Sequence, residues 1–296
     1  MRFAQFFFLF FSFLLSLTHS TVTPASDYHS PRTAALGGAG HAGPMLNDAL
    51  YLNPSFGSLL PSYSFSFGFV KFRSDDLIST PDGISNYYGR NYNLSLQDGR
   101  SELFQAGTGY TKREDGSTLH MGASKAVIKE LGFGIGGKIF FPRNDTDMKL
   151  NDMSFSMTGV PSDWFQSSLT IDNLVQSAHG RSLNWLREFI LGTKFNIMEM
   201  LMLYIDPHYV PALSTGQRFG YELGMELALM KDLFFRLGEY KNSTIPYQSN
   251  RGQGFGIGIG WFAPRISFDY AYSRNLHSFS NLPATNAHTF GFTAYF

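Results

Sequence analysis

Large apolar side chains alternate with glycine, serine or charged residues in many short segments, and this alternation constrains the fold most. In residues 218–229, apolar side chains occupy every second position, whereas Glu222 and Glu226 lie among glycines on the opposite face. A period of two predicts β-strands with one apolar and one polar face. The pattern recurs at residues 62–69, 131–141, 254–261, 266–273 and 287–296. We therefore predict an all-β protein.

Composition narrows the kind of β-protein. The chain has 30 Phe, 15 Tyr and 30 Gly among 296 residues, yet its mean hydropathy is −0.11. A transmembrane β-barrel combines these properties because its lipid-facing and lumen-facing residues alternate and average out. The alternative is a soluble β-sandwich, which rarely has so many aromatic residues. In lipid, an open sheet would leave its edge amides unpaired, so we predict a closed transmembrane antiparallel β-barrel.

Weaker alternating segments set the strand count. They lie at residues 90–97, 103–112, 117–127, 151–160, 165–174, 187–196, 199–209 and 232–241. Together with the clear segments they predict about 14 strands, or 12 if 90–97 and one other segment are loops; an even number is usual in bacterial barrels. Polar stretches at 112–117, 143–152 and 242–251 are predicted turns or external loops, and 177–188 is predicted to hold a short helix. Trp164, Trp185 and Trp261 are candidates for the aromatic girdles.

The two chain ends predict export and insertion. Met1 and Arg2, an apolar run at residues 6–17 and small residues up to Ser20 predict a signal peptide over residues 1–20. The last segment ends on Phe296, which resembles the C-terminal signal by which outer-membrane assembly machinery recognises barrels. We therefore expect a bacterial outer-membrane location, with membrane lipid and that machinery as partners. The 23 basic and 23 acidic residues balance, so no nucleic-acid partner is predicted.

Residues 21–60 differ from the predicted barrel at 61–296, because they are rich in glycine and alanine and do not alternate. They contain Leu36, Gly37, Gly38, Ala39 and Gly40 in succession, then Asp48, and then Asn53, Pro54 and Ser55. This order resembles the FadL-like long-chain fatty-acid transporters and their PorV-like relatives, with Ser55 where the family usually has alanine. Residues 254–260, 266–273 and 288–292 are similar to the last strands of the PorV-like branch. The resemblance implies that residues 21–60 fold into the barrel lumen as a hatch.

The resemblance also implies a function. We expect passive transport of hydrophobic small molecules, specifically long-chain fatty acids, past a hatch that moves, without a cofactor or an energy source. A scaffold or secretion-accessory barrel is the alternative, and the hatch disfavours a general porin. Lys138, Lys194 and Arg236 fall on the inward face by alternation and are candidates to bind a fatty-acid carboxylate. In the alternative interpretation, these cations pair with Glu222, Glu226 and Asp269 and hold the hatch in place.

Enzymatic and metal sites are not predicted. His120, His208 and Asp206 fit no serine–histidine–acid set by spacing. The eight histidines are scattered and show no metal-ligand spacing, and the chain has no cysteine. The glycines at 132, 134 and 136 superficially resemble a dinucleotide loop, but they lie within an alternating segment. We interpret them as a row of lumen-facing glycines.

Overall fold

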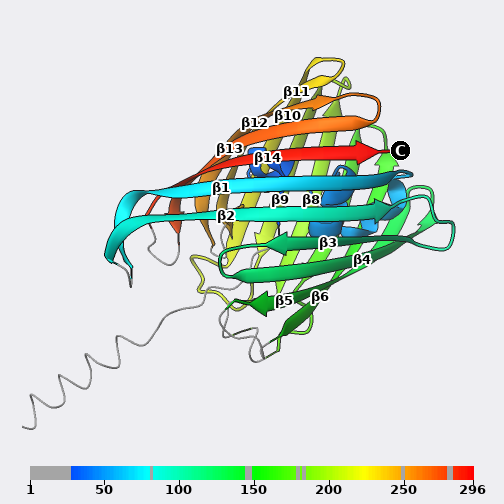
Figure 1. Ribbon diagram of the computed structural model, residues 1–296. Helices are drawn as coiled ribbons and strands as arrows, with labels where there is room; N and C mark the ends of the chain where they lie inside the picture. The colour runs from blue at the N-terminus through cyan, green and yellow to red at the C-terminus, as the bar shows by residue number, and fades with distance from the viewer. Residues whose placement is uncertain are drawn as a thin grey trace, which may run out of the picture.

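The computed structural model describes residues 28–80, 83–143, 149–177, 181, 185–247, 251–278 and 283–296; for 77–80 and 83–87 it describes the backbone alone. The described residues form fourteen strands, each paired antiparallel with the next, and β1 pairs with β14 to close a barrel (Figure 1). The strands are β1 (Tyr63–Thr80), β2 (Gly83–Asp98), β3 (Gln105–Lys112), β4 (Gly116–Ile128), β5 (Leu131–Pro142), β6 (Leu150–Ser162), β7 (Phe165–Asp172), β8 (Glu188–Ile197), β9 (Leu201–Tyr209), β10 (Phe219–Met230), β11 (Leu233–Thr244), β12 (Arg251–Phe262), β13 (Ile266–Ser278) and β14 (Thr285–Tyr295). Closure gives every strand two neighbours, which a barrel in lipid requires.

The predicted fold class and the count of fourteen strands are confirmed. Boundaries differ most in β1 and β2, of 18 and 16 residues, which extend well beyond the predicted 62–69 and 90–97. The register between β1 and β2 shifts between Arg73 and Leu77, so pairing resumes after an irregularity. β6 and β11 extend into stretches predicted to be loops. Of the predicted helix at 177–188, residues 178–180 and 182–184 lie outside the described residues, and Glu188 already belongs to β8.

The alternation of faces is confirmed by burial. Glu226 is 1 % exposed and points into the barrel, whereas Phe219 on the same strand is 67 % exposed. Large apolar side chains such as Ile135, Trp261 and Phe290 lie on the outer face of their strands. Such an outer face suits lipid, and the polar inner face has to find partners within the barrel.

Those partners come from residues 28–60, which we call the lumen segment. It contains α2 (Pro31–Ala35), η1 (Leu46–Asp48), α3 (Ala49–Leu52) and η2 (Pro54–Leu59). In Figure 1 this blue segment lies inside the ring of strands, behind β14 and β1. α2 packs against β12 and β13, and η2 packs against β4 and β5 on the other side of the lumen. The lumen segment thus crosses the barrel interior; the predicted signal peptide and residues 21–27 lie outside the described residues.

Glycines on the barrel wall make room for the lumen segment. A Cβ atom on Gly238 of β11 would collide with the backbone of Leu36, and one on Gly134 of β5 would collide with the backbone of Ser55. A side chain at either position would therefore push the segment away from the wall. The predicted row of glycines in β5 does face the lumen, where it accommodates the segment.

The two ends of the barrel differ. Turns at the end near Phe296 are short, whereas most connections at the opposite end are longer, as in bacterial barrels. Ile245 and Tyr247, between β11 and β12, fold inward and are buried, as does Trp185 between β7 and β8. Within the described residues, no helix has the length and apolar character needed to cross a membrane.

Candidate functional site

Arg32 anchors the lumen segment to the barrel wall. It lies in α2, which begins after Ser30, whose Oγ accepts a hydrogen bond from the backbone N–H of Thr33 at 3.2 Å. The Nε of Arg32 donates to Oε2 of Glu226 in β10 at 3.2 Å, and its Nη2 donates to the hydroxyl of Tyr204 in β9 at 2.7 Å. Because Arg32 is buried, these protein groups replace its hydration.

Glu226 also pairs with a second arginine. Arg236 of β11 lies directly opposite Glu226, and its Nε donates to Glu226 Oε2 at 2.5 Å. The Nη1 of Arg236 donates to Oδ1 of Asp269 in β13 at 2.5 Å. Arg32, Glu226, Arg236 and Asp269 therefore form an alternating series, which we call the charge row. Its two positive and two negative groups balance, as buried charges require.

Asp206 of β9 binds the glycine-rich turn of the lumen segment. Its Oδ2 accepts hydrogen bonds from the backbone N–H of Gly40 at 2.8 Å and of His41 at 2.9 Å, and lies 3.0 Å from Nδ1 of His41. Gly40 has φ +127°, a conformation that side chains rarely adopt. The predicted hatch glycines thus bring two backbone amides to one buried carboxylate.

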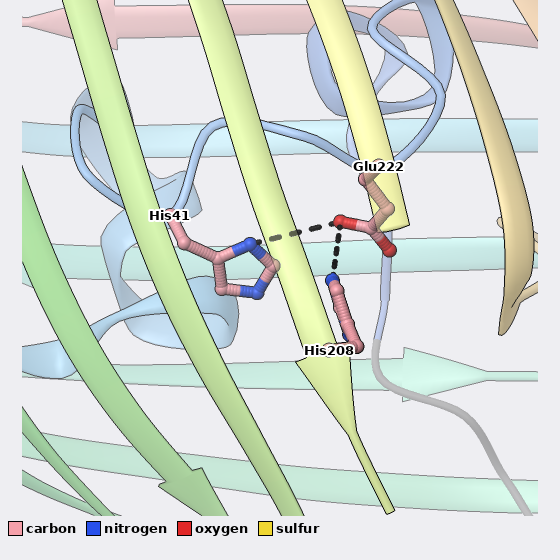
Figure 2. Close-up of side chains that lie close together, drawn as sticks. All are labelled: His41, His208 and Glu222. Carbon is pink, nitrogen blue, oxygen red and sulfur yellow. Dashed lines mark ion pairs between the residues drawn. The ribbon is translucent and has the colours of Figure 1, made fainter. Parts of the chain in front are cut away.

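A second buried cluster continues from His41 (Figure 2). The Nδ1 of His41 lies 3.7 Å from Oε2 of Glu222 in β10, and Nε2 of His208 in β9 lies 3.3 Å from the same oxygen. Nδ1 of His208 contacts Oε1 of Glu188 in β8 at 2.7 Å. Arg251 of β12 donates to both oxygens of Glu188, at 2.8 and 2.6 Å. We call these five residues the histidine cluster.

Asn53 and Ser55, which flank the predicted Pro54, fix the other side of the lumen segment. The Nδ2 of Asn53 donates to the carbonyl of His41 at 2.6 Å and to Oγ1 of Thr158 in β6 at 2.7 Å. The Oγ of Ser55 donates to Oδ1 of Asn53 at 2.6 Å. The Asn-Pro-Ser sequence therefore contacts the barrel wall. The hydroxyl of Ser55, at the position where the family that the sequence resembles usually has alanine, adds the hydrogen bond to Asn53.

The three predicted ligand-binding cations lie in different surroundings. Arg236 belongs to the charge row, and Lys138 of β5 pairs with Asp172 of β7 at 2.7 Å. Lys194 of β8 lies beside Gly43, with Nζ 5.9 Å from the ring centroid of Tyr204. Arg236 and Lys194 thus both border the lumen segment near Tyr204, whereas Lys138 lies beside Trp185 in a separate cluster. Arg236 therefore has the partners of the alternative interpretation, whereas Lys138 pairs with a carboxylate outside the set named there.

The residues weighed for catalysis have other contacts. His208 lies between two carboxylates, and Asp206 binds the lumen segment. His120 of β4 packs against the ring of Tyr51 at a centroid distance of 5.0 Å. None of these contacts joins a histidine to a serine hydroxyl in the way that a catalytic triad requires.

Apolar residues line the lumen at the end with long connections. Val70 and Phe72 of β1 cluster with Tyr240 of β11 and with the inward-folded Ile245 and Tyr247. The rings of Phe72 and Tyr247 stack at a centroid distance of 5.5 Å. We call these residues the apolar vestibule. The prediction placed small or polar side chains on the inward face of each strand. Val70 and Phe72 lie on that face of β1 but are apolar.

Two cavities lie on either side of the wall formed by β13, β14 and β1. The outer one, of about 430 Å³, is bordered by aromatic side chains such as Trp261 and Phe268. The inner one, of about 40 Å³, lies between this wall and the lumen segment. Asp269, Gly291 and Phe67 border both cavities. The inner space is far smaller than the roughly 300–1,000 Å³ of ordinary ligand pockets.

Asp48, a predicted hatch residue, is buried beside the charge row. Burial raises the pKa of its carboxyl to about 6, although Arg32, at 3.8 Å, and a hydrogen bond from Ser30 favour the charged form. Asp269 adds a smaller contribution in the same direction as burial, and Arg236 opposes it. The carboxyl therefore titrates close to neutral pH.

Several residues that connect the lumen segment to the wall, or support those that do, were not predicted, above all Arg32 and His41 in the segment and Glu188 and Arg251 behind His208. Alternation would have placed Glu188 on one face of a strand, but it does not reveal partners. Arg32 and His41 lie in a segment without periodicity, and their wall contacts are 194 and 165 residues away in sequence. Such pairs become visible only in three dimensions.

The chain is similar to known proteins in its three-dimensional structure but not detectably in its sequence. No family model matches the chain, and no curated protein matches its sequence. Similar solved structures are the Pseudomonas putida toluene transporter TodX (TM-score 0.64, 11 % identity, 93 % of this chain and 99 % of that chain) and the Ralstonia pickettii toluene transporter TbuX (0.64, 11 %, 92 % and 99 %). A Pseudomonas aeruginosa FadL homologue aligns with a TM-score of 0.56 at 11 % identity over 92 % of this chain and 99 % of that chain. At such identities the likeness concerns the fold.

The fold and the interior define a class of protein. The chain forms a closed fourteen-stranded barrel with a folded N-terminal segment in its lumen, and its structural neighbours include FadL-type barrels. This agrees with the resemblance found in the sequence.

Proposed function

We propose that the protein is an outer-membrane channel for hydrophobic small molecules, with the lumen segment as its hatch. The observation that carries this proposal is the way the segment fills the barrel: it is held by side-chain ion pairs and hydrogen bonds from separate wall strands. Such contacts can break without unpairing the barrel itself. Transporters of toluene share the fold, which supports a hydrophobic substrate.

The apolar vestibule is the proposed entry site. Its stacked Phe72 and Tyr247 offer an apolar surface inside the barrel, at the end opposite Phe296. A water-filled porin has no need for such a surface, whereas a hydrophobic substrate that leaves water is stabilised by it. Passage beyond the vestibule requires movement of the lumen segment, because the inner cavity is too small for a substrate.

Long-chain fatty acids are the proposed substrate class, and Lys194 is the proposed carboxylate partner. Of the three candidate cations, Arg236 and Lys138 have close carboxylate partners, at 2.5 and 2.7 Å. Lys194 instead lies over the ring of Tyr204 beside the lumen segment. A cation in this position would meet a carboxylate as the segment moves.

The outer-membrane location is part of the proposal. The aromatic outer face and the cavity of about 430 Å³ suit contact with lipid acyl chains. Phe296 pairs with Tyr63 through backbone hydrogen bonds at 2.9 and 3.4 Å and leaves its ring exposed. This exposed terminal ring at the barrel seam is the proposed target for assembly machinery, after export directed by residues 1–20.

A polar-packed lumen also favours a second function, that of a non-transporting scaffold. The charge row and the histidine cluster fill the interior around the lumen segment, as a permanently closed barrel would require. A channel differs from a scaffold in that its lumen segment leaves this position.

Transport in proteoliposomes tests the two functions. We expect purified protein to accelerate the uptake of labelled oleate and of toluene above that of protein-free liposomes. Lys194→Ala should lower oleate uptake several-fold and leave toluene uptake unchanged, because toluene has no carboxylate. Lys125→Ala, at an exposed position of β4, is the matched control. Uptake of both compounds at the rate of protein-free liposomes would favour the scaffold.

A further inference from the structure

Three buried side chains from three separate elements converge in the histidine cluster. His41 comes from the lumen segment, His208 from β9 and Glu222 from β10, and each is less than 5 % exposed. One nitrogen or oxygen from each lies within 4.8 Å of the other two. Figure 2 shows both imidazole rings directed at the carboxylate of Glu222. Two histidines and one glutamate are a ligand set that zinc sites use.

The contacts of His208 leave its Nε2 and Oε2 of Glu222 facing each other. Its Nδ1 faces the Glu188 carboxylate at 2.7 Å, so Nδ1 carries a proton and donates it. In a neutral ring, Nε2 then has a lone pair, which faces the lone pairs of Glu222 Oε2 at 3.3 Å. Neither of these two buried atoms makes a hydrogen bond. Either a second proton or a metal ion has to lie between them.

Several features favour the metal ion. Tetrahedral ligands at about 2.0–2.1 Å from Zn²⁺ lie roughly 3.3–3.4 Å from one another. The two contacts to Glu222 Oε2 are 3.3 Å from His208 and 3.7 Å from His41. Glu188, itself held by two hydrogen bonds from Arg251, fixes the ring of His208. A carboxylate behind a ligating histidine is the usual outer-shell arrangement of metal sites.

Asp206 lies beside one of the proposed ligands and is not itself one of them. Its Oδ2 lies 3.0 Å from Nδ1 of His41, and Asp206 is directly opposite Glu222 in the pairing of β9 with β10. The side chains whose ligand atoms all lie within 4.8 Å of one another are His41, His208 and Glu222. Metal binding at Nδ1 of His41 would release the proton that this nitrogen shares with Asp206. A water molecule then takes the fourth position, as in other zinc sites with three protein ligands.

We propose that His41, His208 and Glu222 bind a divalent transition-metal ion of the Zn²⁺ type, which fastens the lumen segment to β9 and β10. Imidazole ligands select such ions over Mg²⁺ and Ca²⁺, which prefer oxygen. Because His41 is the ligand from the lumen segment, the ion holds that segment in place. The metal site is independent of transport, whereas an effect of the ion on channel opening rests on the proposed function.

The test uses tag-free, folded protein in detergent, stripped with EDTA and dialysed. Zn²⁺ is titrated by calorimetry, and the bound metal is counted by elemental analysis after equilibrium dialysis. We expect one Zn²⁺ per chain, no comparable binding of Mg²⁺, and slower protease cleavage of the lumen segment when Zn²⁺ is bound. Co²⁺ should give the intense visible absorption of a four-coordinate site. Neither binding nor proteolysis depends on transport, so failure here is distinguishable from failure of the channel proposal.

Variants assign the metal to these ligands. Glu222→Gln and His41→Asn should each weaken Zn²⁺ binding at least tenfold, and the second leaves the wall strands intact. His120→Asn, which changes another buried, lumen-facing histidine, is the matched control and should bind like the parent. The heat-dependent electrophoretic shift of folded barrels verifies folding of each variant. Absence of bound Zn²⁺, equal binding by Mg²⁺, or unchanged affinity in both folded variants would overturn the site and leave a doubly protonated His208. Zn²⁺ binding without slower cleavage would overturn its fastening role.

Discussion

At the scale of single residues, the interior depends on charges that have lost water and gained protein partners. Glu226 is the centre of the charge row, because it accepts from Arg32 on one side and from Arg236 on the other. Replacing water around such groups is costly, and their mutual attraction only offsets that cost when every partner is present. Removal of the central charge is therefore more damaging than loss of a surface ion pair.

Glu226→Gln should destabilise the closed barrel by about 3 kcal/mol, because Arg32 and Arg236 would then face each other without a shared counter-charge. Glu199→Gln, in the exposed turn between β8 and β9, should change stability by less than about 0.5 kcal/mol. Chemical unfolding followed by tryptophan fluorescence measures both. Equal stability of the two variants would contradict the role given to the charge row.

Asp48→Asn should remove a pH dependence. The pKa of Asp48 in the folded protein is about 6, above the ordinary value of 3.8, so folding favours the neutral carboxyl. Its stabilising contribution is complete below about pH 4 and is lost as the pH rises through 6. The difference in pKa corresponds to about 3 kcal/mol at most.

Unfolding at pH 4, 5, 6 and 7 checks this expectation. Arg32, Arg236 and Asp269 surround Asp48 and remain in the variant, so the difference between parent and Asp48→Asn isolates one group. The parent should lose stability relative to the variant as the pH rises. Parallel curves for the two proteins would show that Asp48 does not titrate in this range.

At the scale of elements, alternation predicted the strands well because each strand has one apolar outer face and one face turned to the lumen. Glu222, Glu226, Arg236 and Asp269 were placed inward on this basis, and the structure agrees. The lengths of β1 and β2 were not predicted, because the alternation of large apolar and small residues does not continue beyond Phe69 and residues 74–76 are all polar. The ion pairs between these side chains could not be predicted either, because alternation shows which face of a strand a residue occupies but not which residue lies beside it.

Gly238→Ala should loosen the lumen segment, because the added methyl group would meet the backbone of Leu36. The expected results are faster protease cleavage within residues 28–60 and a higher rate of uptake through the channel. Gly137→Ala is the matched control, as a Cβ at that position meets nothing within 4 Å. If Gly238→Ala behaves like Gly137→Ala in both assays, the close contact between Gly238 and Leu36 does not hold the lumen segment in place.

At the scale of the whole molecule, the barrel encloses a folded segment that fills its lumen. The glycine-rich sequence and the resemblance to FadL-like proteins predicted a hatch at residues 21–60, and the structure places residues 28–60 within the barrel. That this segment moves is the central claim, since the segment crosses the lumen and the described cavity beside it has only about 40 Å³. Sequence could not predict how the segment is held, because its contacts come from strands distant in the chain.

A reversible crosslink tests this movement most directly. The Cβ of Pro54 lies 3.7 Å from a Cβ atom placed on Gly122 of β4, a separation that suits a disulfide. The chain has no cysteine of its own, so Pro54→Cys with Gly122→Cys introduces a single pair. Each single variant, Pro54→Cys or Gly122→Cys, is the matched control, because it carries the same substitution and forms no crosslink within the chain.

Uptake of oleate and toluene is then measured in proteoliposomes with the disulfide oxidised and again after reduction, beside the two single variants treated in the same way. We predict that the oxidised Pro54–Gly122 pair blocks uptake, that reduction restores it, and that oxidation has no effect on either single variant. Uptake through the oxidised, fully crosslinked Pro54–Gly122 variant at the rate of its reduced form would contradict the claim that the lumen segment is a moving hatch.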